Sequence, residues 1–272
     1  MSSRVAVAMS VYKSETAINL RHSLESLYKQ IYPSIDIYLQ VDGPITKELD
    51  IVLNEFTKRG FLYIEYYPSN KGLAFQLNRA IERIYSKGVY NYIARMDSDD
   101  ISTPDRIKNQ IEYLERNPHI AVLGTSILEF GEEGDEFLKV MPESHDVLKK
   151  NIVKRCPVNH PTVIFNLNVI NKSDLKYNPD LLNTQDYYLW VELLKKGYRF
   201  ANLKDVGLRF RINKDFHSRR GVNKALNDFR SRVFAIKQLE VHSFSNYLHC
   251  VLLIFLRLSP KFIKKLLYRE FR

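Results

Sequence analysis

Cysteine is scarce in this sequence of 272 residues, which contains only Cys156 and Cys250. The two lie far apart and without the spacing of metal ligands, so we expect no disulfide framework and a reducing compartment. Long apolar runs are also missing. The strongly apolar stretch 247–258 has 12 residues, whereas a helix needs roughly 20 to span a bilayer core. The amino terminus lacks the apolar segment of a signal peptide, so we expect the protein on the cytoplasmic side.

Acidic residues are scarce near the carboxyl terminus, and this shapes the net charge of +10. Residues 209–272 hold 15 Lys and Arg against 4 Asp and Glu, a net of +11, whereas residues 1–208 hold 26 against 27, a net of −1. A basic appendage on a near-neutral body predicts contact with an anionic surface or substrate through that region. With 45% hydrophobic residues, the chain is long enough for one large domain, or a domain plus an appendage.

What the sequence does contain is an alternation of strand-like and helix-like segments. Residues 4–11 are a continuous run of small and β-branched apolar residues, typical of a strand buried on both faces. The alternation predicts an α/β fold with a doubly wound sheet, helices on both faces and a ligand crevice at the carboxyl ends of the strands. We expect strands at 4–11, 35–41, 61–66, 92–95 and 120–124, helices at 16–31, 47–59 and 105–116, and a helix that starts within 70–80.

The second half of the chain is less regular. We expect a polar, hairpin-like loop at 131–136, a short helix at 145–155 and a turn into a strand at 159–165. A further helix is expected from Thr184 to Gly197, with Asp186 in its first turn. The tail is expected to be helical from about residue 222.

Three carboxylates, Asp97, Asp99 and Asp100, follow directly on the apolar run 92–96. Residues i and i+2 of an extended chain face the same way, so Asp97 and Asp99 can converge on one divalent cation. The alternative is a solvated acidic turn that caps the following helix. Asp42 also falls at the end of an expected strand, and two carboxylate sites on one rim of the sheet favour a ligand site.

Five motifs in chain order resemble the inverting glycosyltransferases of family 2, which build bacterial surface polysaccharides such as O-antigen. The resemblance covers about residues 4–215, and it implies a GT-A fold, a Rossmann-like doubly wound mixed sheet, followed here by a helical tail. The motifs are Ser10-Val11-Tyr12, Val41-Asp42-Gly43, Asn70-Lys71-Gly72-Leu73-Ala74 with Asn78, Asp97-Ser98-Asp99-Asp100 with Pro104 and Arg106, and Gln185-Asp186 with Leu189-Trp190.

By this resemblance the donor is a UDP-sugar whose uracil forms a hydrogen bond with Asp42. Asp97 is expected near the ribose or the metal, and Asp99 is expected to bind directly a divalent metal that bridges the diphosphate. Carboxylate oxygens suit Mg²⁺ or Mn²⁺, which neutralise the charge that develops on the departing diphosphate. For Arg79, a structural salt bridge is an equal alternative to donor contact. The implied donor-binding residues are Ser10, Tyr12, Asp42, Lys71, Arg79, Asp97 and Ser98.

The resemblance makes Asp186 the catalytic base, because an inverting transfer is one displacement in which a carboxylate takes the proton of the attacking hydroxyl. The alternative for Asp186 is stabilisation of a helix amino terminus. Gln185, His160 and Trp190 are expected on the acceptor side, although a structural role is the alternative for His160. His217 is a candidate third metal ligand or phosphate clamp, or else part of a basic surface loop.

We therefore expect a GT-A catalytic domain over residues 1–215 and a basic, helical region over 216–272. At helical angles the end of the tail separates into an apolar and a basic face, which fits an interfacial membrane helix. A helix that packs on the body is the alternative. The apolar face contains Phe262, Ile263, Leu266, Leu267 and Phe271, and the basic face contains Lys261, Lys264, Lys265, Arg269 and Arg272.

The predicted function is metal-dependent transfer of a hexose, galactose or glucose, from a UDP-sugar to a polyprenyl-diphosphate-linked sugar. Its expected place is the inner face of the cell membrane, as a peripheral protein in O-antigen or capsule synthesis. One alternative is a catalytically inactive nucleotide-sugar-binding module, suggested by Gln185 where the family has an acidic residue. An acidic-cluster phosphohydrolase is another. Nucleic-acid binding is not expected, because the basic tail has no recognisable motif or aromatic stacking platform.

Overall fold

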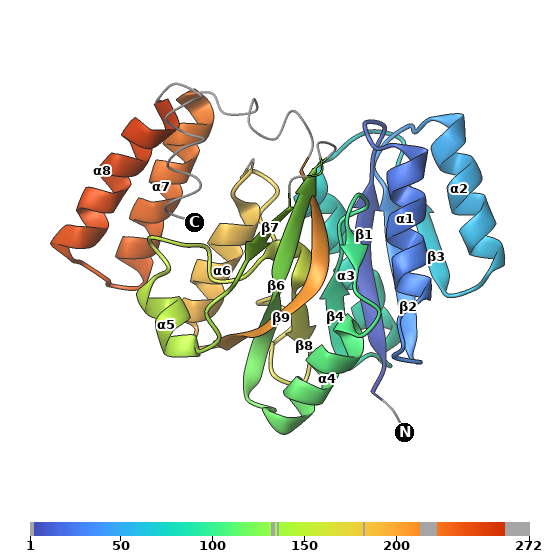
Figure 1. The fold of residues 1–272 in the computed structure, drawn as a ribbon, viewed down its shortest axis with the longest axis horizontal. Coiled ribbons are helices and arrows are strands. Elements are labelled where there is room, and N and C mark those ends of the chain that lie inside the picture. Colours follow the sequence, from blue (N-terminus) through green and yellow to red (C-terminus); the bar gives the residue numbers. More distant parts are fainter. Residues whose placement is uncertain (1–2, 132–133, 135, 182, 213–221, 259–272) are drawn as a thin grey trace.

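Nine strands form one mixed sheet in the computed structural model, which describes residues 3–131, 134, 136–181, 183–212 and 222–258 (Figure 1). The strands are β1 (Val5–Val11), β2 (Ile35–Val41), β3 (Leu62–Tyr66), β4 (Tyr92–Arg95), β5 (Ile101–Ser102), β6 (Ile120–Gly131), β7 (Glu136–Lys139), β8 (Ile164–Asn166) and β9 (Arg199–Ile212). The helices are α1 (Ala17–Tyr28), α2 (Lys47–Lys58), α3 (Leu73–Lys87), α4 (Arg106–Arg116), α5 (His145–Lys150), a 3₁₀ turn (His160–Thr162), α6 (Gln185–Lys195), α7 (Val222–Gln238) and α8 (Phe244–Leu258).

The sheet has a parallel half and a mixed half. Its strand order is β3-β2-β1-β4-β8-β6-β9-β5, and β7 pairs with β6. Strands β1 to β4 are parallel, so their carboxyl ends lie at one edge. Strand β8 is antiparallel to both β4 and β6, and β9 runs parallel to β6. This is the GT-A arrangement that the sequence predicts, with the mixed sheet and helices on both faces.

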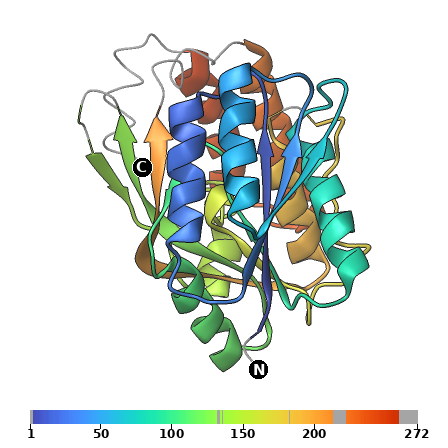
Figure 2. The ribbon, with the colours of Figure 1, turned by 90° about the vertical axis from the view of Figure 1, so that its right-hand side faces the viewer.

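Alternating side chains of the strands build two hydrophobic cores. On β1, Ala6 and Ala8 face one core, and Val5, Val7, Met9 and Val11 face the other. Helices α1, α2 and α4 cover the second core, whereas α3 and α6 cover the first. Figure 2 shows α1 and α2 side by side, with α3 on the other side of the strands.

Most expected elements of the first half are confirmed within a few residues, but three strands were not predicted: β5, β7 and β9. Strand β9 has charged and polar residues in its middle, although Val206, Leu208, Phe210 and Ile212 alternate as a strand should. Strand β5 has two residues and leaves no periodic signal. The helix expected at 145–155 ends at Lys150 and continues as turns.

Helices α7 and α8 extend the molecule beyond α6 (Figure 1). Ala235 and Ile236 of α7 and Cys250 of α8 belong to the same hydrophobic core as α6. The rings of Tyr188 on α6 and Phe234 on α7 lie 4.5 Å apart. Among the described residues, no helix combines the length and apolarity needed to cross a membrane. The amphipathic segment expected after residue 260 lies outside the described residues.

Candidate active site

Asp42 lies just after β2 and binds the amino terminus of α3. Its Oδ1 accepts hydrogen bonds from the Lys71 backbone N–H at 2.7 Å and from Gln76 Nε2 at 2.6 Å, and its Oδ2 accepts from the Gly72 backbone N–H at 2.9 Å. Gly72 has φ +87°, a conformation that favours glycine. The carboxylate is thus fixed by a helix amino terminus, where negative charge is favourable. The Val41-Asp42-Gly43 and Asn70-Lys71-Gly72 motifs therefore form one structural unit.

The two turns of this unit also touch directly. Gly43 has φ +83°, and a Cβ atom added there would lie 2.8 Å from the backbone N of Asn70. Asn70 Nδ2 donates a hydrogen bond of 3.4 Å to the Asp42 carbonyl. Glycine is therefore required at position 43 both by its backbone conformation and by the close approach of the second turn.

The acidic cluster, defined as Asp97, Asp99 and Asp100, follows β4 at the same edge of the sheet. One carboxylate oxygen from each residue can be chosen so that all three lie within 4.8 Å of one another. Asp100 is fully buried, and its Oδ1 accepts from the Arg211 backbone N–H at 2.9 Å. Arg211 Nε also donates to the Asp99 carbonyl at 3.0 Å. Strand β9, which was not predicted, therefore fixes the cluster through Arg211.

The acidic cluster fits a divalent cation by its electrostatics as well as by its geometry. Burial raises the pKa of Asp99 to about 7, and the charges of Asp97 and Glu15 add to this. Burial also raises the pKa of Asp100, with a further contribution from Asp97. Asp100 Oδ2 accepts no hydrogen bond from any described residue. Oxygen ligands of this kind match Mg²⁺ or Mn²⁺.

Arg95, the last residue of β4, is a buried cation beside the acidic cluster. It is 2% exposed, and its Nη1 lies 2.5 Å from Asp97 Oδ1, an ion pair rather than an aligned hydrogen bond. Its Nε has no hydrogen-bond acceptor among the described residues. The same charge lowers the pKa of Asp186 and of His160. Arg95 therefore acts on the acidic cluster and on the predicted base.

Asp186 occupies the first turn of α6 in a half-buried position. Burial raises its pKa, while the Tyr187 backbone N–H, Arg95 and Arg232 lower it. Arg232 comes from α7: its guanidinium lies 4.1 Å from the centroid of the Tyr187 ring, and its Nη1 donates to the Ile152 carbonyl at 2.9 Å. A carboxylate whose pKa is raised is better matched to proton transfer near neutral pH.

His160 packs against Tyr177 and Trp190. Its Nε2 is 2.9 Å from the Tyr177 hydroxyl, and burial together with Arg95 holds its pKa well below the usual value. His160 is therefore a neutral hydrogen-bonding group. Burial raises the pKa of Tyr177, and the charges of Asp186 and Asp97 add to that rise. The pKa of Tyr177 is thus influenced by the charge of the predicted base and by that of the acidic cluster.

These geometries agree with a comparison to known proteins, in which residues 6–177 match Glycosyl transferase family 2. The chain belongs to this family. A glycosyltransferase of Haemophilus influenzae is 34% identical, and the amylovoran biosynthesis glycosyltransferase AmsE of Erwinia amylovora is 31% identical; each match covers 98% of both chains. An Escherichia coli protein named UDP-Gal:alpha-D-GlcNAc-diphosphoundecaprenol beta-1,3-galactosyltransferase is 25% identical over 98% of this chain and 96% of its own.

Solved structures of glycosyltransferases share the fold. The mannosyltransferase PcManGT of Pyrobaculum calidifontis, in complex with GDP-Man and Mn²⁺, has a TM-score of 0.66 and 14% identity, and the match covers 98% of this chain and 79% of that one. S. aureus TarS 1–349 in complex with UDP-GlcNAc has a TM-score of 0.63 and 15% identity, with 97% and 83% covered. The resemblance to a family 2 glycosyltransferase with a GT-A fold is thus confirmed.

Trp190 does not lie where the resemblance to the family implies. The ring is 0% exposed and packs against Phe165, Phe200 and His160, with each pair of ring centroids 5.9 Å apart. The described position of Trp190 is therefore one of core packing. Gln185, one turn earlier, is half-buried, and its Oε1 accepts no hydrogen bond from a described residue.

Arg79 is occupied by neighbours on the surface of α3. It donates to the Tyr67 hydroxyl at 2.9 Å and to Glu82 at 2.7 Å, and a salt bridge of 3.8 Å joins it to Glu65. These contacts match the structural alternative for Arg79. Lys71, by contrast, is exposed, and its backbone N–H donates a hydrogen bond to Asp42.

The other predicted donor residues surround the end of β1 and the acidic cluster. Ser10 is half-buried and Tyr12 is exposed. Ser98 Oγ donates to Glu15 Oε2 at 3.4 Å, and Glu15 also accepts from the Thr16 backbone N–H at 2.7 Å. Glu15 was missed in the sequence because it belongs to no acidic cluster along the chain. His217 lies outside the described residues.

Asn78 has a role that the motif alone did not specify. Its Nδ2 donates to the Tyr177 carbonyl and its Oδ1 accepts from the Tyr177 N–H, both at 2.8 Å. This pair of bonds joins α3 to a segment 99 residues away in the sequence. It fixes the backbone of Tyr177, whose hydroxyl contacts His160.

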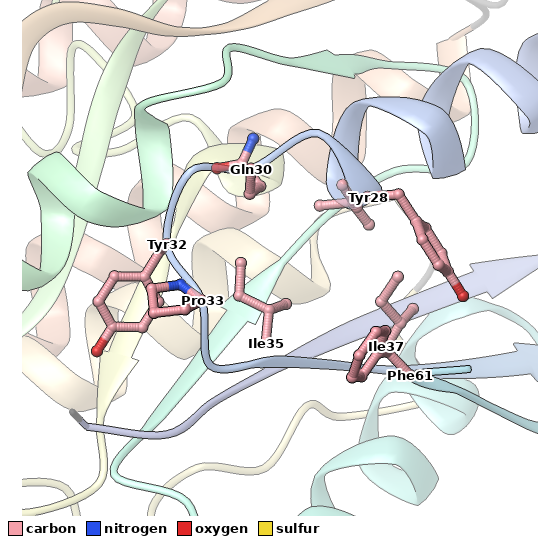
Figure 3. Close-up of a pocket in the computed structure, with 8 residues that line it drawn as sticks. Tyr28, Gln30, Tyr32, Pro33, Ile35, Ile37 and Phe61 are labelled. Carbon is pink, nitrogen blue, oxygen red and sulfur yellow. The ribbon is translucent and has the colours of Figure 1, made fainter. Parts of the chain in front are cut away.

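A hollow in the surface lies at the amino-terminal end of β2, away from the carboxyl ends of the strands. Figure 3 shows the aromatic and aliphatic side chains around it, among them Tyr28, Tyr32, Ile35 and Phe61. Its volume is about 140 Å³, and sites for small-molecule ligands usually have 300–1,000 Å³. It contains none of the acidic residues described above, so we do not assign the donor to it.

Proposed function

We propose that this glycosyltransferase is an inverting, metal-dependent enzyme that transfers a hexose, galactose or glucose, from a UDP-sugar to a polyprenyl-diphosphate-linked sugar. The observation that carries the proposal is the common influence of Arg95 on Asp97, beside which it lies, and on Asp186, whose pKa it lowers. The acidic cluster and a candidate base are therefore both influenced by the charge of one buried cation. A UDP-sugar is supported by the names of the E. coli relative and of the TarS complex.

In this proposal, Asp97 and Asp99 would hold Mn²⁺ or Mg²⁺. The ion would supply positive charge to stabilise the departing UDP. His217 is the proposed third ligand. Asp42 would accept the uracil N–H through Oδ2, which has one protein donor at 2.9 Å. Ser10, Tyr12, Lys71 and Ser98 would complete the donor site.

Asp186 would perform the proton transfer. The acceptor hydroxyl oxygen forms a bond to the anomeric carbon as the bond from that carbon to the UDP oxygen breaks, and the hydroxyl proton moves to the Asp186 carboxylate. One displacement of this kind inverts the anomeric centre. Gln185 and His160 would orient the acceptor, because both present hydrogen-bonding groups next to Asp186 or Tyr177.

The proposed location is the cytoplasmic face of the cell membrane, where the enzyme would act peripherally in O-antigen or capsule synthesis. Two observations support this. The E. coli relative is named for an acceptor on diphosphoundecaprenol. In addition, residues 209–272 carry a net charge of +11, and basic segments are attracted to the anionic inner leaflet.

The first test is a panel of UDP-sugars, incubated with the purified protein, Mn²⁺ and a lipid-diphosphate-linked GlcNAc acceptor, with the product identified by mass. Gain of one hexose only when metal is present is the expected result. Binding of a UDP-sugar without transfer to any acceptor in a broad panel would favour the inactive binding module. Release of UDP or phosphate without an acceptor would favour a hydrolase.

A further inference from the structure

Helix α8 carries an unbroken apolar stripe on its exposed side. The stripe repeats at the helical intervals i, i+3, i+4, i+7, i+8 and i+11, which align its members along one face. Phe244 is 83% exposed, Phe255 66% and Leu252 54%. No charged side chain occurs between residues 244 and 255. The α8 stripe consists of Phe244, Tyr247, Leu248, Val251, Leu252 and Phe255.

The opposite side of α8 is the one that packs on the protein. Cys250 is 1% exposed and lies in the core shared with α6 and α7. Asn246 is 7% exposed, and its Nδ2 donates to the Val241 carbonyl at 2.8 Å. In Figure 1, α8 is the outermost helix, with α7 between it and α6. The α8 stripe is therefore not the helix face that the fold buries.

The stripe differs from the other exposed apolar residues. Ile18 and Ile51 are also more than 60% exposed, but they line one small hollow between α1 and α2 together with the charged residues Arg21 and Glu48. A few apolar residues interspersed with charged ones are common on a surface and need no ligand. Six that align on one helix form a contiguous patch, which indicates an interaction surface.

We propose that the α8 stripe inserts into a lipid bilayer that contains anionic headgroups. The charge of the residues that follow the stripe favours an anionic membrane as the partner: residues 257–272 hold six Lys and Arg and one Glu. Apolar residues flanked by basic ones suit a membrane interface with acidic lipids. A second copy of this chain carries the same net positive charge, which opposes self-association.

The proposal deepens the proposed function, on which its biological meaning rests. Helix α8 packs on α7, and Arg232 of α7 lies over the ring of Tyr187, the residue after Asp186. Insertion of α8 would therefore place the start of α6 at a fixed position near the bilayer. The sugar of a lipid-linked acceptor is held at that same surface.

The test is flotation of the full-length protein with vesicles, independent of any sugar transfer. The probes are vesicles of phosphatidylethanolamine with phosphatidylglycerol, and vesicles of phosphatidylcholine alone. The double variant Leu248→Gln and Leu252→Gln removes apolar area from the stripe at exposed positions. The matched control, Ile18→Gln and Ile51→Gln, makes the same kind of change at exposed positions of α1 and α2.

We expect the wild type and the control to float with the anionic vesicles, and the stripe variant to partition at least about tenfold less. Equal partition of the stripe variant and the wild type would overturn the proposal. A second result would also overturn it: the wild type binds no vesicles but forms a dimer in light scattering, and the stripe variant is monomeric. Transfer to a short, soluble acceptor tests the proposed function separately, and it should be unchanged in the stripe variant.

Discussion

The proposed donor side and the proposed acceptor side of this site are built in different ways. The donor side comprises turns that directly follow the parallel strands β1, β2 and β4, together with the start of α3, and Arg211 of β9 adds a contact to the acidic cluster. The acceptor side comprises the start of α6, His160, Tyr177 and α7, and it is held by contacts between segments far apart in sequence. The comparison indicates that strand order brings the proposed donor residues close together, whereas the proposed acceptor residues meet only in the complete tertiary structure.

The two sides also differ in their electrostatics. On the donor side, burial and mutual repulsion raise the pKa of Asp99 and Asp100, so the acidic cluster is stabilised by an added cation. On the acceptor side, burial raises the pKa of Asp186, but Arg95 and Arg232 counteract part of that rise, and His160 is neutral. We therefore expect metal to affect the donor side most strongly, and protein cations to tune the acceptor side.

The largest effect is expected from Asp186→Asn on the acceptor side. The amide cannot take the proton of the acceptor hydroxyl, so kcat should fall by about 10²–10⁴-fold. UDP affinity, measured by calorimetry with Mn²⁺, should remain within about twofold, because the donor side is intact. Asp205→Asn, at an exposed position on β9, is the control. Retained turnover in Asp186→Asn would remove this residue from the role of base.

Asp99→Asn should separate metal binding from stability on the donor side. Because folding raises the pKa of Asp99 from 3.8 to about 7, the folded protein favours the protonated side chain, and its stability contribution is lost as pH rises through 7. At pH 8 without metal, the variant should therefore unfold at a higher temperature than the wild type. The same variant should lose the rise in Tm that Mn²⁺ and UDP produce in the wild type. A lower metal-free Tm would contradict this reasoning.

The wild type should also bind Mn²⁺ more weakly in acid. Metal binding requires the carboxylate form, and Asp99 has a pKa of about 7, so below pH 7 the ion must displace a proton. The apparent affinity should fall by up to about tenfold per pH unit between pH 7 and pH 5. Titration calorimetry in buffers of different ionisation enthalpy would detect the released proton. An affinity independent of pH across this range would contradict the prediction.

Arg95→Met should affect both sides at once, because the charge of Arg95 acts on both. This positive charge opposes the rise in the pKa of Asp186 that burial causes, so its removal should raise that pKa further and move the acidic limb of the kcat profile to higher pH. Arg95→Lys keeps the charge and should shift the limb less. If both variants lose activity equally at every pH, Arg95 has a structural role alone.

The residues of the proposed donor side leave a clearer signal in the sequence than the contacts of the proposed acceptor side, for a physical reason. Asp42, Asp97 and Asp99 each follow an apolar strand, and parallel strands bring their carboxyl ends together. Arg95 left a weaker signal, a basic residue at the end of a buried strand. No local pattern shows that Arg232 would reach Tyr187. Trp190 lay in a motif, but its burial depends on Phe165 and Phe200, which come from separate strands.

Asn78→Ala should have the smallest effect and should locate the boundary between the two sides. The variant removes both 2.8 Å hydrogen bonds to the Tyr177 backbone and leaves buried polar groups unpaired, at a cost of about 1–3 kcal/mol in stability. Asn109→Ala, whose side chain bonds only to exposed Asp105 within its own helix, is the control. Because Tyr177 holds His160, the KM for the acceptor should rise while UDP affinity stays the same. If acceptor affinity and UDP affinity fell equally, the contact between α3 and the segment around Tyr177 would support both sides, and it would not mark a boundary between them.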